Sequence, residues 1–357
     1  MPSEIALGGV IGVALILYLV LGGADFGGGV WDLLAMGPRR VQQRRAIEHA
    51  IGPIWEANHV WLILVVVVLF TGFPPAFAAL STALHVPLTL FLIGVVFRGS
   101  AFAFRGMEGG TARHDHPVQR RWGLVFSLAS LISPVLLGMV VGAIASGRIR
   151  VAAAPGVAAS GFWGPWVAPF PIAIGLYALA LCAFLAATYL TVEVEGDREL
   201  QRDFRARALG AGVAVGACAL LAFGLSGSGA PLIREGLTRR WWTWLLHAGT
   251  AAVALGALAA LWRGWFRLAR VLAGAQTAAI LAGWAASQYP YLLVPDFTIW
   301  NAAAPAETRR WLLVFLAAGV PVLVPSLVVL YRVFKAAGRE DTGAGSAAGE
   351  NPSEGAH

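Results

Sequence analysis

Long apolar runs recur along almost the whole of this chain, and they limit its possible folds more than any other feature. A helix needs about 20 residues to cross about 30 Å of hydrocarbon. Runs near this length lie at residues 5–24, 54–71, 76–97, 122–145, 166–191, 208–226, 243–262, 268–287 and 311–334. Only helices and closed barrels satisfy the backbone in lipid, and the sequence shows no strand-like alternation. It therefore predicts an all-α polytopic membrane protein with about nine transmembrane helices.

The composition agrees with this fold class. Of 357 residues, 13% are charged, compared with about 25% in typical soluble domains. The first run follows no basic residue and precedes no clear cleavage site, so we interpret it as a retained helix and not as a signal peptide. We expect residues 1–337 to form one transmembrane domain. Residues 338–357, rich in Gly, Ala, Ser and Glu, are expected to be a disordered cytoplasmic tail.

The basic residues predict an orientation. Nineteen of the 26 Lys and Arg residues lie after the first, third, fifth and seventh runs or in the tail, and seven lie in the opposite loops. Under the positive-inside rule, this places the N-terminus outside and the C-terminus in the cytoplasm. The charges are spread over many loops, so they indicate contact with membrane lipids and no nucleic-acid site.

Polar residues at membrane depth are costly, so those present are candidates for function. One group opens the second run in the stretch WEANHVW, where Glu56, Asn58 and His59 lie between Trp55 and Trp61. Glu56 and His59 are three residues apart and share a helix face, so the two side chains could pass protons. In the alternative, Glu56 caps the helix, Asn58 bonds locally and the tryptophans mark the membrane interface.

A second acid, Asp25, lies in the stretch GGADFGGGVWD. Small residues allow helices to approach closely, which would leave Asp25 beside another helix or a file of water. In the alternative, the helix unwinds through glycine and Asp25 is solvated among the headgroups. Glu193, Glu195, Arg98 and Arg105 close other runs on the same predicted side. These residues together indicate an ionisable layer reached from the cytoplasm.

Metal sites have little support in this sequence. His85 and His247 lie within predicted helices and are weak candidates for haem ligands, because a lone membrane histidine more often forms a hydrogen bond. Cys182 and Cys218 lack CxxC spacing and are expected to be buried as small apolar side chains. The glycine run follows a hydrophobic helix and no strand, so it is not interpreted as a nucleotide site.

Several blocks of this sequence, in order, resemble subunit II of the cytochrome bd quinol oxidases, including the cyanide-insensitive branch. They are GADFGGG (23–29), GPIWEANHVWLI (52–63), LFTGFPPAFAA (69–79), FRGSAFAFR (97–105), YPYLLVP (289–295) and FTIWNAA (297–303). The resemblance covers nearly the whole chain before the tail, and its first four blocks are specific in combination. We accordingly expect two four-helix bundles plus a peripheral helix.

The resemblance implies a terminal oxidase of aerobic respiration in a bacterial cytoplasmic membrane. Subunit I, the partner in a heterodimer, would carry haems b and d, oxidise quinol and reduce oxygen to water. This chain would carry no metal and no catalytic residue, support assembly and help to conduct cytoplasmic protons. The family also leaves room for a small single-helix subunit.

The same resemblance selects residues for the proton path. Glu56 matches the family acid that follows Trp55, Asp25 matches the acid of the glycine block, and Arg98 matches the arginine of the F-R block. We add His59 to this path as a partial substitute. The remaining polar and interfacial residues of these blocks, expected to have structural roles, are Trp55, Asn58, Trp61 and Arg105.

Some positions depart from the family pattern. Ala57 replaces a glycine, His59 replaces Glu or Gln, Ala103 stands where an acid is frequent, and Asn301 stands where Asp is common. A proton path that uses an acid at position 103 cannot run in its usual form in this chain.

Two alternatives stay open beside the oxidase interpretation. One is a proton- or solute-coupled transporter, for which midplane acids and an inverted repeat are missing. The other is a purely structural subunit in which every polar group is a cap or an anchor.

Overall fold

The computed structural model describes residues 2–51, 55–106, 117–150 and 161–347. Its helices are α1 (Ser3–Leu17), η1 (Tyr18–Gly22), α2 (Gly23–Leu33), α3 (Arg40–Ile51), α4 (Trp55–Gly72), α5 (Pro74–Ala83), α6 (His85–Gly106), α7 (Pro117–Ser146), α8 (Pro169–Glu193), α9 (Arg198–Gly229), α10 (Pro231–Thr238), α11 (Thr243–Arg263), α12 (Phe266–Gln288) and α13 (Ala306–Ala347). Among the described residues, eight helices are long and apolar enough to cross a membrane, or nine if the bent pair α3–α4 is one span.

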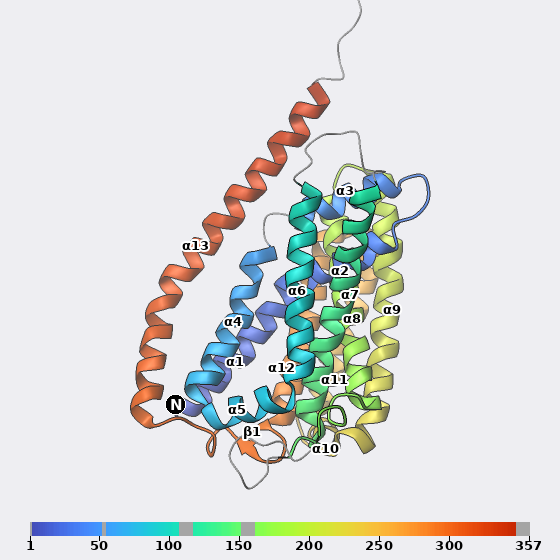
Figure 1. Cartoon of the computed structure of the whole chain (residues 1–357). Helices are drawn as coiled ribbons and strands as arrows, with labels where there is room; N and C mark the ends of the chain where they lie inside the picture. Colours follow the sequence, from blue (N-terminus) through green and yellow to red (C-terminus); the bar gives the residue numbers. More distant parts are fainter. Residues whose placement is uncertain (1, 52–54, 107–116, 151–160, 348–357) are drawn as a thin grey trace, which may run out of the picture.

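The spans form two groups of four with α13 at the edge. The first group contains α1–α2, α4, α6 and α7, and the second contains α8, α9, α11 and α12. Helix α8 joins them because it packs on α2 and α7 as well as on α9 and α12. Helix α13 packs mainly on α1 and α4, and Figure 1 shows it inclined away from the other helices. This arrangement agrees with the expected pair of bundles and peripheral helix.

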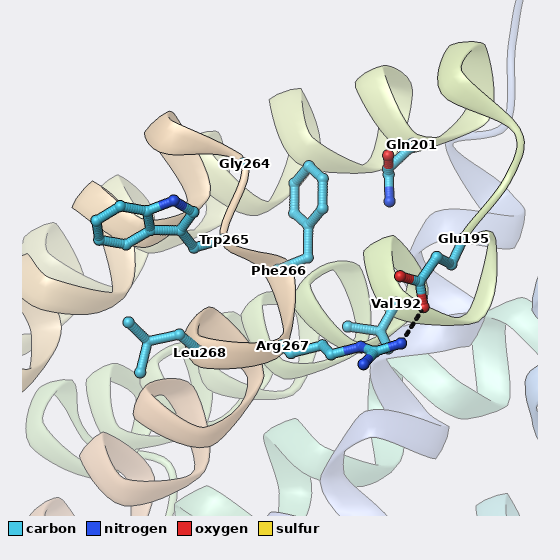
Figure 2. A pocket seen from close by; sticks show the side chains of 8 residues that line it. All are labelled: Val192, Glu195, Gln201, Gly264, Trp265, Phe266, Arg267 and Leu268. Atoms are coloured by element: carbon cyan, nitrogen blue, oxygen red, sulfur yellow. Dashed lines mark hydrogen bonds and ion pairs between the residues drawn. The ribbon is translucent and has the colours of Figure 1, made fainter.

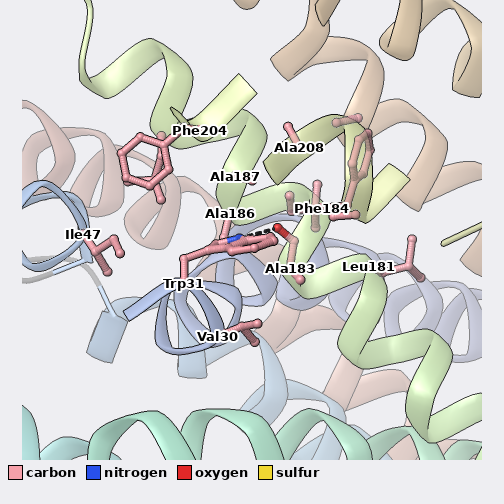
Figure 3. Packing of buried hydrophobic residues seen from close by; sticks show 14 of the residues in the cluster. Val30, Trp31, Ile47, Leu181, Ala183, Phe184, Ala186, Ala187, Phe204 and Ala208 are labelled. Atoms are coloured by element: carbon pink, nitrogen blue, oxygen red, sulfur yellow. Dashed lines mark hydrogen bonds between the residues drawn. The ribbon is translucent and has the colours of Figure 1, made fainter. Parts of the chain in front are cut away.

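Trp31 of α2 anchors the contact between the two groups. Its indole Nε1 donates a 2.8 Å hydrogen bond to the carbonyl oxygen of Ala183 on α8. Figure 3 shows the ring lying beside the small side chains of Ala183, Ala186 and Ala187, with Phe204 of α9 nearby. The small residues of α8 allow its backbone to approach α2 closely, as is typical of membrane helices.

Two predicted helix boundaries were wrong. The first helix does not end at residue 24: α1, the π-helical turn η1 and α2 form one span, Ser3–Leu33. The run at 76–97 is divided at Leu84, which lies outside the helical region, and α6 starts afresh at His85. The restart places Pro87 in the first turn of α6, where a missing N–H costs no hydrogen bond. The helix before this break, α5, lies across one end of the molecule (Figure 1).

The same end carries the only strands among the described residues, a short antiparallel pair of β1 (Tyr291–Leu293) and β2 (Phe297–Thr298). Asn301 closes this hairpin: its Oδ1 accepts from the backbone N–H of Thr298 at 2.6 Å, and its Nδ2 donates to the carbonyl of Asp296 at 2.9 Å. An Asp side chain at position 301 has no N–H group to donate the second bond. The Asn that replaces the common Asp therefore stabilises the hairpin here.

Helix α3 and the start of α9 lie at the opposite end. Arg39 joins them through ion pairs with Asp203 at 2.7 Å and Glu199 at 2.9 Å. Asp197 caps the N-terminus of α9, since its Oδ1 accepts from two backbone N–H groups of the first turn. Helix α13 extends to Ala347. Residues 338–347 of the predicted disordered tail are therefore helical in the structure. Residues 348–357 lie outside the described part, so disorder there stays a prediction.

Candidate functional site

The glycine-rich stretch remains helical and brings three neighbouring helices close to α2. A Cβ atom at Gly27 would overlap the carbonyl of Cys182 on α8, one at Gly28 would overlap the side chain of Ile51 on α3, and one at Gly29 would overlap Ser130 on α7. Asp25 lies in the same helix and is 9% exposed. The alternative in which the helix unwinds and leaves Asp25 solvated is therefore wrong, and close helix approach is the reason that this acid is buried.

Asp25 is held by an amide from α4. The Asn58 Nδ2 group donates a 2.7 Å hydrogen bond to Oδ2 of Asp25 and lies 3.3 Å from the carbonyl of Leu21. Both side chains are buried. A hydrogen bond to a buried carboxylate is charge-assisted and therefore strong. Asn58 thus bonds to an acid 33 residues away in the sequence, on another helix, and is not limited to local bonds within α4.

The π-helical turn η1 lies immediately before Asp25. Such a turn interrupts the regular ladder of helical hydrogen bonds and often occurs at functional sites. Its carbonyls accept hydrogen bonds from side chains of two other helices: Leu21 from Asn58, and Val20 from the hydroxyl of Tyr189 on α8 at 3.1 Å. These bonds fix the backbone on the N-terminal side of Asp25.

A buried guanidinium supplies positive charge to the same place. Arg98 of α6 is 1% exposed, and its Nε donates to Oγ of Ser130 at 3.2 Å. Its Cζ lies 4.9 Å from the ring centre of Phe26 and 5.5 Å from that of Phe126. The charges of Arg98 and Asp25 are close enough to attract each other. Burial of either charge alone would be expensive, so each stabilises the other.

A second buried acid, Asp32, extends this cluster along α2. It is 1% exposed, and one carboxylate oxygen accepts from Oγ of Ser127 at 2.9 Å. Arg44 of α3 approaches the other carboxylate oxygen at 3.8 Å and the backbone carbonyl of Asp32 at 3.3 Å. Since Arg44 is partly exposed, this end of the cluster lies close to the surface.

We call this set the polar column. Its members are Asp25, Asp32, Asn58, Arg98, Ser127 and Ser130. Sequence reasoning missed Asp32 and the two serines. The signal was present: Asp32 follows Asp25 by two helical turns, and the serines are one turn apart, so each pair shares a helix face. The column therefore lines the contact of α2 with α4, α6 and α7.

The other predicted path residues lie at the edge of this column or outside it. His59 is partly buried, with its ring centre 5.8 Å from that of Tyr18 and 6.1 Å from that of Phe26. Glu56 is exposed on α4, and Ala103 is exposed on α6. The structure therefore joins Asp25, Asn58, His59 and Arg98, and leaves Glu56 at the surface of this chain.

The structural and interfacial candidates are only partly described. Trp61 packs against the apolar cluster that contains Tyr18 and Phe26. The side chains of Trp55 and Arg105 lie outside the described part of the structure.

Both weak metal candidates make backbone hydrogen bonds. Nδ1 of His85 lies 2.8 Å from the carbonyl of Thr82, and Nε2 of His247 lies 2.9 Å from the carbonyl of Leu237. Both side chains are exposed. Within the ranges that the structure describes, no group of three or more His, Cys, Asp or Glu residues is placed to hold a metal ion. Cys182 is buried and Cys218 partly buried, and neither forms a disulfide.

Comparison with known proteins gives a consistent result. A family model described as cytochrome bd terminal oxidase subunit II matches residues 3–334. Cytochrome bd ubiquinol oxidase subunit 2 of Bacillus subtilis (strain 168) is 32% identical over 36% of this chain and 36% of its own length. Cytochrome bd-I ubiquinol oxidase subunit 2 of Escherichia coli (strain K12) is 27% identical over 54% of this chain and 49% of its own length.

A solved structure shares the fold across nearly the whole chain. It is described as the structure of bd oxidase from Geobacillus thermodenitrificans, with a TM-score of 0.74 and 23% identity. The match covers 94% of this chain and 99% of that one. The family model covers far more than half of the present sequence, and the arrangement of helices agrees with it. This multi-pass membrane chain belongs to the cytochrome bd terminal oxidase subunit II family.

Proposed function

We propose that this chain is the subunit of a quinol:oxygen oxidoreductase that carries no haem, in a heterodimer with subunit I in a bacterial cytoplasmic membrane. Family membership supports this role over the transporter alternative. The two curated relatives named above, whose names include ubiquinol oxidase, are matched over 36% and 49% of their own lengths. The quinol, the partner and the reaction are therefore proposals for this chain.

Haems b and d belong on the partner in this proposal. When bound there, they carry electrons from quinol to oxygen. His85 and His247 do not fit a haem site, because each side chain is exposed and one of its ring nitrogens already contacts a backbone carbonyl. No step on this chain is derived through a haem. A small single-helix subunit remains a prediction.

The polar column is the observation that supports proton conduction. Asp25 has one carboxylate oxygen occupied by the Asn58 amide, which leaves its other oxygen available to accept a proton. The positive charge of Arg98 stabilises the carboxylate before that proton arrives. A serine hydroxyl can both donate and accept a hydrogen bond. Ser127 donates to Asp32 and Ser130 accepts from Arg98, so with intervening water the two hydroxyls can relay protons between Asp32 and Asp25. The column thus offers alternating proton donors and acceptors through an apolar bundle.

The orientation predicted from the basic loops places α3 and the start of α9 on the cytoplasmic side. Arg44 and Asp32 would then lie at the cytoplasmic mouth of the column, and Asp25 deeper inside. Glu56 is exposed on α4, two residues before Asn58, where it can collect protons from water. Such a route does not need an acid at Ala103, which faces away from the column at the surface.

One experiment separates proton conduction from a purely structural role. Asp25→Asn and Glu56→Gln are introduced singly and together, and quinol-driven oxygen uptake is measured per haem in the purified complex. We expect uptake to fall while the haem spectrum stays normal. Normal uptake in the double variant would support the structural alternative. Loss of the haem bands together with the complex would assign Asp25 to assembly.

A further inference from the structure

A pocket outside the polar column opens where α8, α9, α11 and α12 meet. It has a volume of about 370 Å³, within the usual range for small ligands. Its polar lining residues are Glu195, Gln201 and Arg267, and its apolar wall includes Val192, Trp265 and Phe266. Figure 2 shows Arg267 joined to Glu195 beside the end of α8, with Phe266 and Gln201 on the same side of the α11–α12 turn and Trp265 and Leu268 on its other side.

The pocket carries one positive and one negative group side by side. Nη2 of Arg267 lies 2.9 Å from Oε2 of Glu195. The two side chains are 80% and 59% exposed, so solvent weakens their attraction and either group can turn to a ligand at little cost. A ligand that matches both groups must itself carry a negative and a positive charge a short distance apart.

The rest of the pocket fits an amphipathic ligand at a membrane surface. Trp265 and nearby Trp262 are exposed aromatic residues at helix ends, as is typical of membrane interfaces. Arg205 fixes the adjoining wall, because its Nη2 donates to the carbonyl of Trp262. From the pocket, the exposed side chains of Leu268 and Val271 continue along one face of α12. This apolar face can accommodate an acyl chain.

We propose that this pocket binds the headgroup of an aminophospholipid of the phosphatidylethanolamine class. Arg267 would bind the phosphate, Glu195 the primary ammonium, and Leu268 and Val271 an acyl chain. An anionic lipid would satisfy Arg267 but would bring further negative charge beside Glu195. A choline headgroup has no N–H to donate to that carboxylate. The charge pair therefore selects a zwitterion that donates hydrogen bonds, and this role is independent of oxygen reduction.

The chain provides a matched control for this pair. Arg239 and Glu235 form an exposed ion pair on α10 and the residue that follows it, at 3.2 Å and with 78% and 62% exposure. Their chemistry and exposure match those of Arg267 and Glu195, but neither residue lines the pocket. Substitution of these four surface residues should leave the fold intact, which thermal unfolding of each purified variant would verify.

Native mass spectrometry of the purified protein, with the subunits it retains, would test the proposal. Phosphatidylethanolamine, phosphatidylglycerol and phosphatidylcholine with identical acyl chains are titrated separately. We expect one site that prefers phosphatidylethanolamine by about tenfold or more, the scale of one charge-assisted hydrogen bond. Arg267→Gln should lose binding of all three lipids. Glu195→Gln should lose the preference for ethanolamine while still binding phosphatidylglycerol, and Arg239→Gln and Glu235→Gln should behave as wild type.

Two results would overturn the proposal. If wild type binds phosphatidylglycerol as tightly as phosphatidylethanolamine, the pocket recognises phosphate alone and Glu195 has no part in selection. If Arg267→Gln and Arg239→Gln have the same lipid affinities, the lipid does not bind in this pocket.

Discussion

Asn58 of α4 donates a 2.7 Å hydrogen bond to Asp25 of α2, across the contact between two membrane spans. The bond joins two of the sequence blocks that resemble the cytochrome bd family. It also links the π-helical turn before Asp25 to α4, because the same amide lies 3.3 Å from the carbonyl of Leu21. The buried acid is therefore held in a defined position, as a proton carrier would need to be.

Removal of this amide should destabilise the protein and slow its reaction. Asn58→Ala leaves a buried carboxylate oxygen without its donor, which costs about 1–3 kcal/mol. We expect a lower thermal unfolding temperature and slower oxygen uptake per haem. Thr82→Ala is a suitable control, because its hydroxyl bonds only within its own exposed turn. Equal unfolding temperatures for Asn58→Ala and Thr82→Ala would contradict the assigned bond.

The charges of Arg98 and Asp25 should compensate each other. Arg98→Met leaves a buried carboxylate without its counter-charge, and the loss of one partner of a buried pair costs about 3–5 kcal/mol. The double variant Arg98→Met with Asp25→Asn removes both charges and should be more stable than Arg98→Met alone. Yield and thermal unfolding of the complex measure both effects. A double variant that is less stable than either single variant would show that the two charges do not interact.

Gly27 of α2 should tolerate no side chain. Gly27→Ala places a methyl group on the Cys182 carbonyl, and overpacking of this kind costs about 1–3 kcal/mol. Gly12→Ala is the matched control in the same span, since a Cβ there meets no atom within 4 Å. We expect Gly27→Ala to reduce the amount of assembled complex and Gly12→Ala to leave it unchanged. The amount of assembled complex is measured as the haem recovered per gram of membrane protein.

Asp32 should matter for turnover as well as for packing. Asp32→Asn retains a side chain that can bond to Ser127 but removes the negative charge beside Arg44. We expect oxygen uptake to fall several-fold with normal haem content. Asp296→Asn, at the opposite end of the molecule in the hairpin, provides the control. Wild-type uptake in Asp32→Asn would confine the proton route to the part of the column around Asp25.

Much of this fold could be predicted from the sequence, because hydrophobic length determines where spans lie. The break at Leu84 was missed because apolar residues lie on both sides of it. The continuation of the first span to Leu33 was missed because glycines were interpreted as a helix end. In the structure, these glycines are points of contact between packed helices.

The site was harder to predict, because it depends on the rotation of each helix about its axis. Glu56 and Asn58 are two residues apart and cannot share a helix face. Only Asn58 points into the bundle, and Glu56 is exposed. Which of the two is buried depends on the packing of α4 against α1 and η1, and this packing cannot be derived from the spacing of residues within α4.

The most direct test of the central claim is the rate of proton uptake by the purified complex during oxygen reduction, followed with a pH-sensitive dye. The comparison is between wild type and Asp25→Asn at equal haem content. The account predicts proton uptake at least about tenfold slower in the variant, because the amide of Asn cannot take up and release a proton as the Asp25 carboxylate does. A tenfold change corresponds to about 1.4 kcal/mol in the barrier. Equal rates in the two proteins would contradict it and would leave the polar column with a structural role alone.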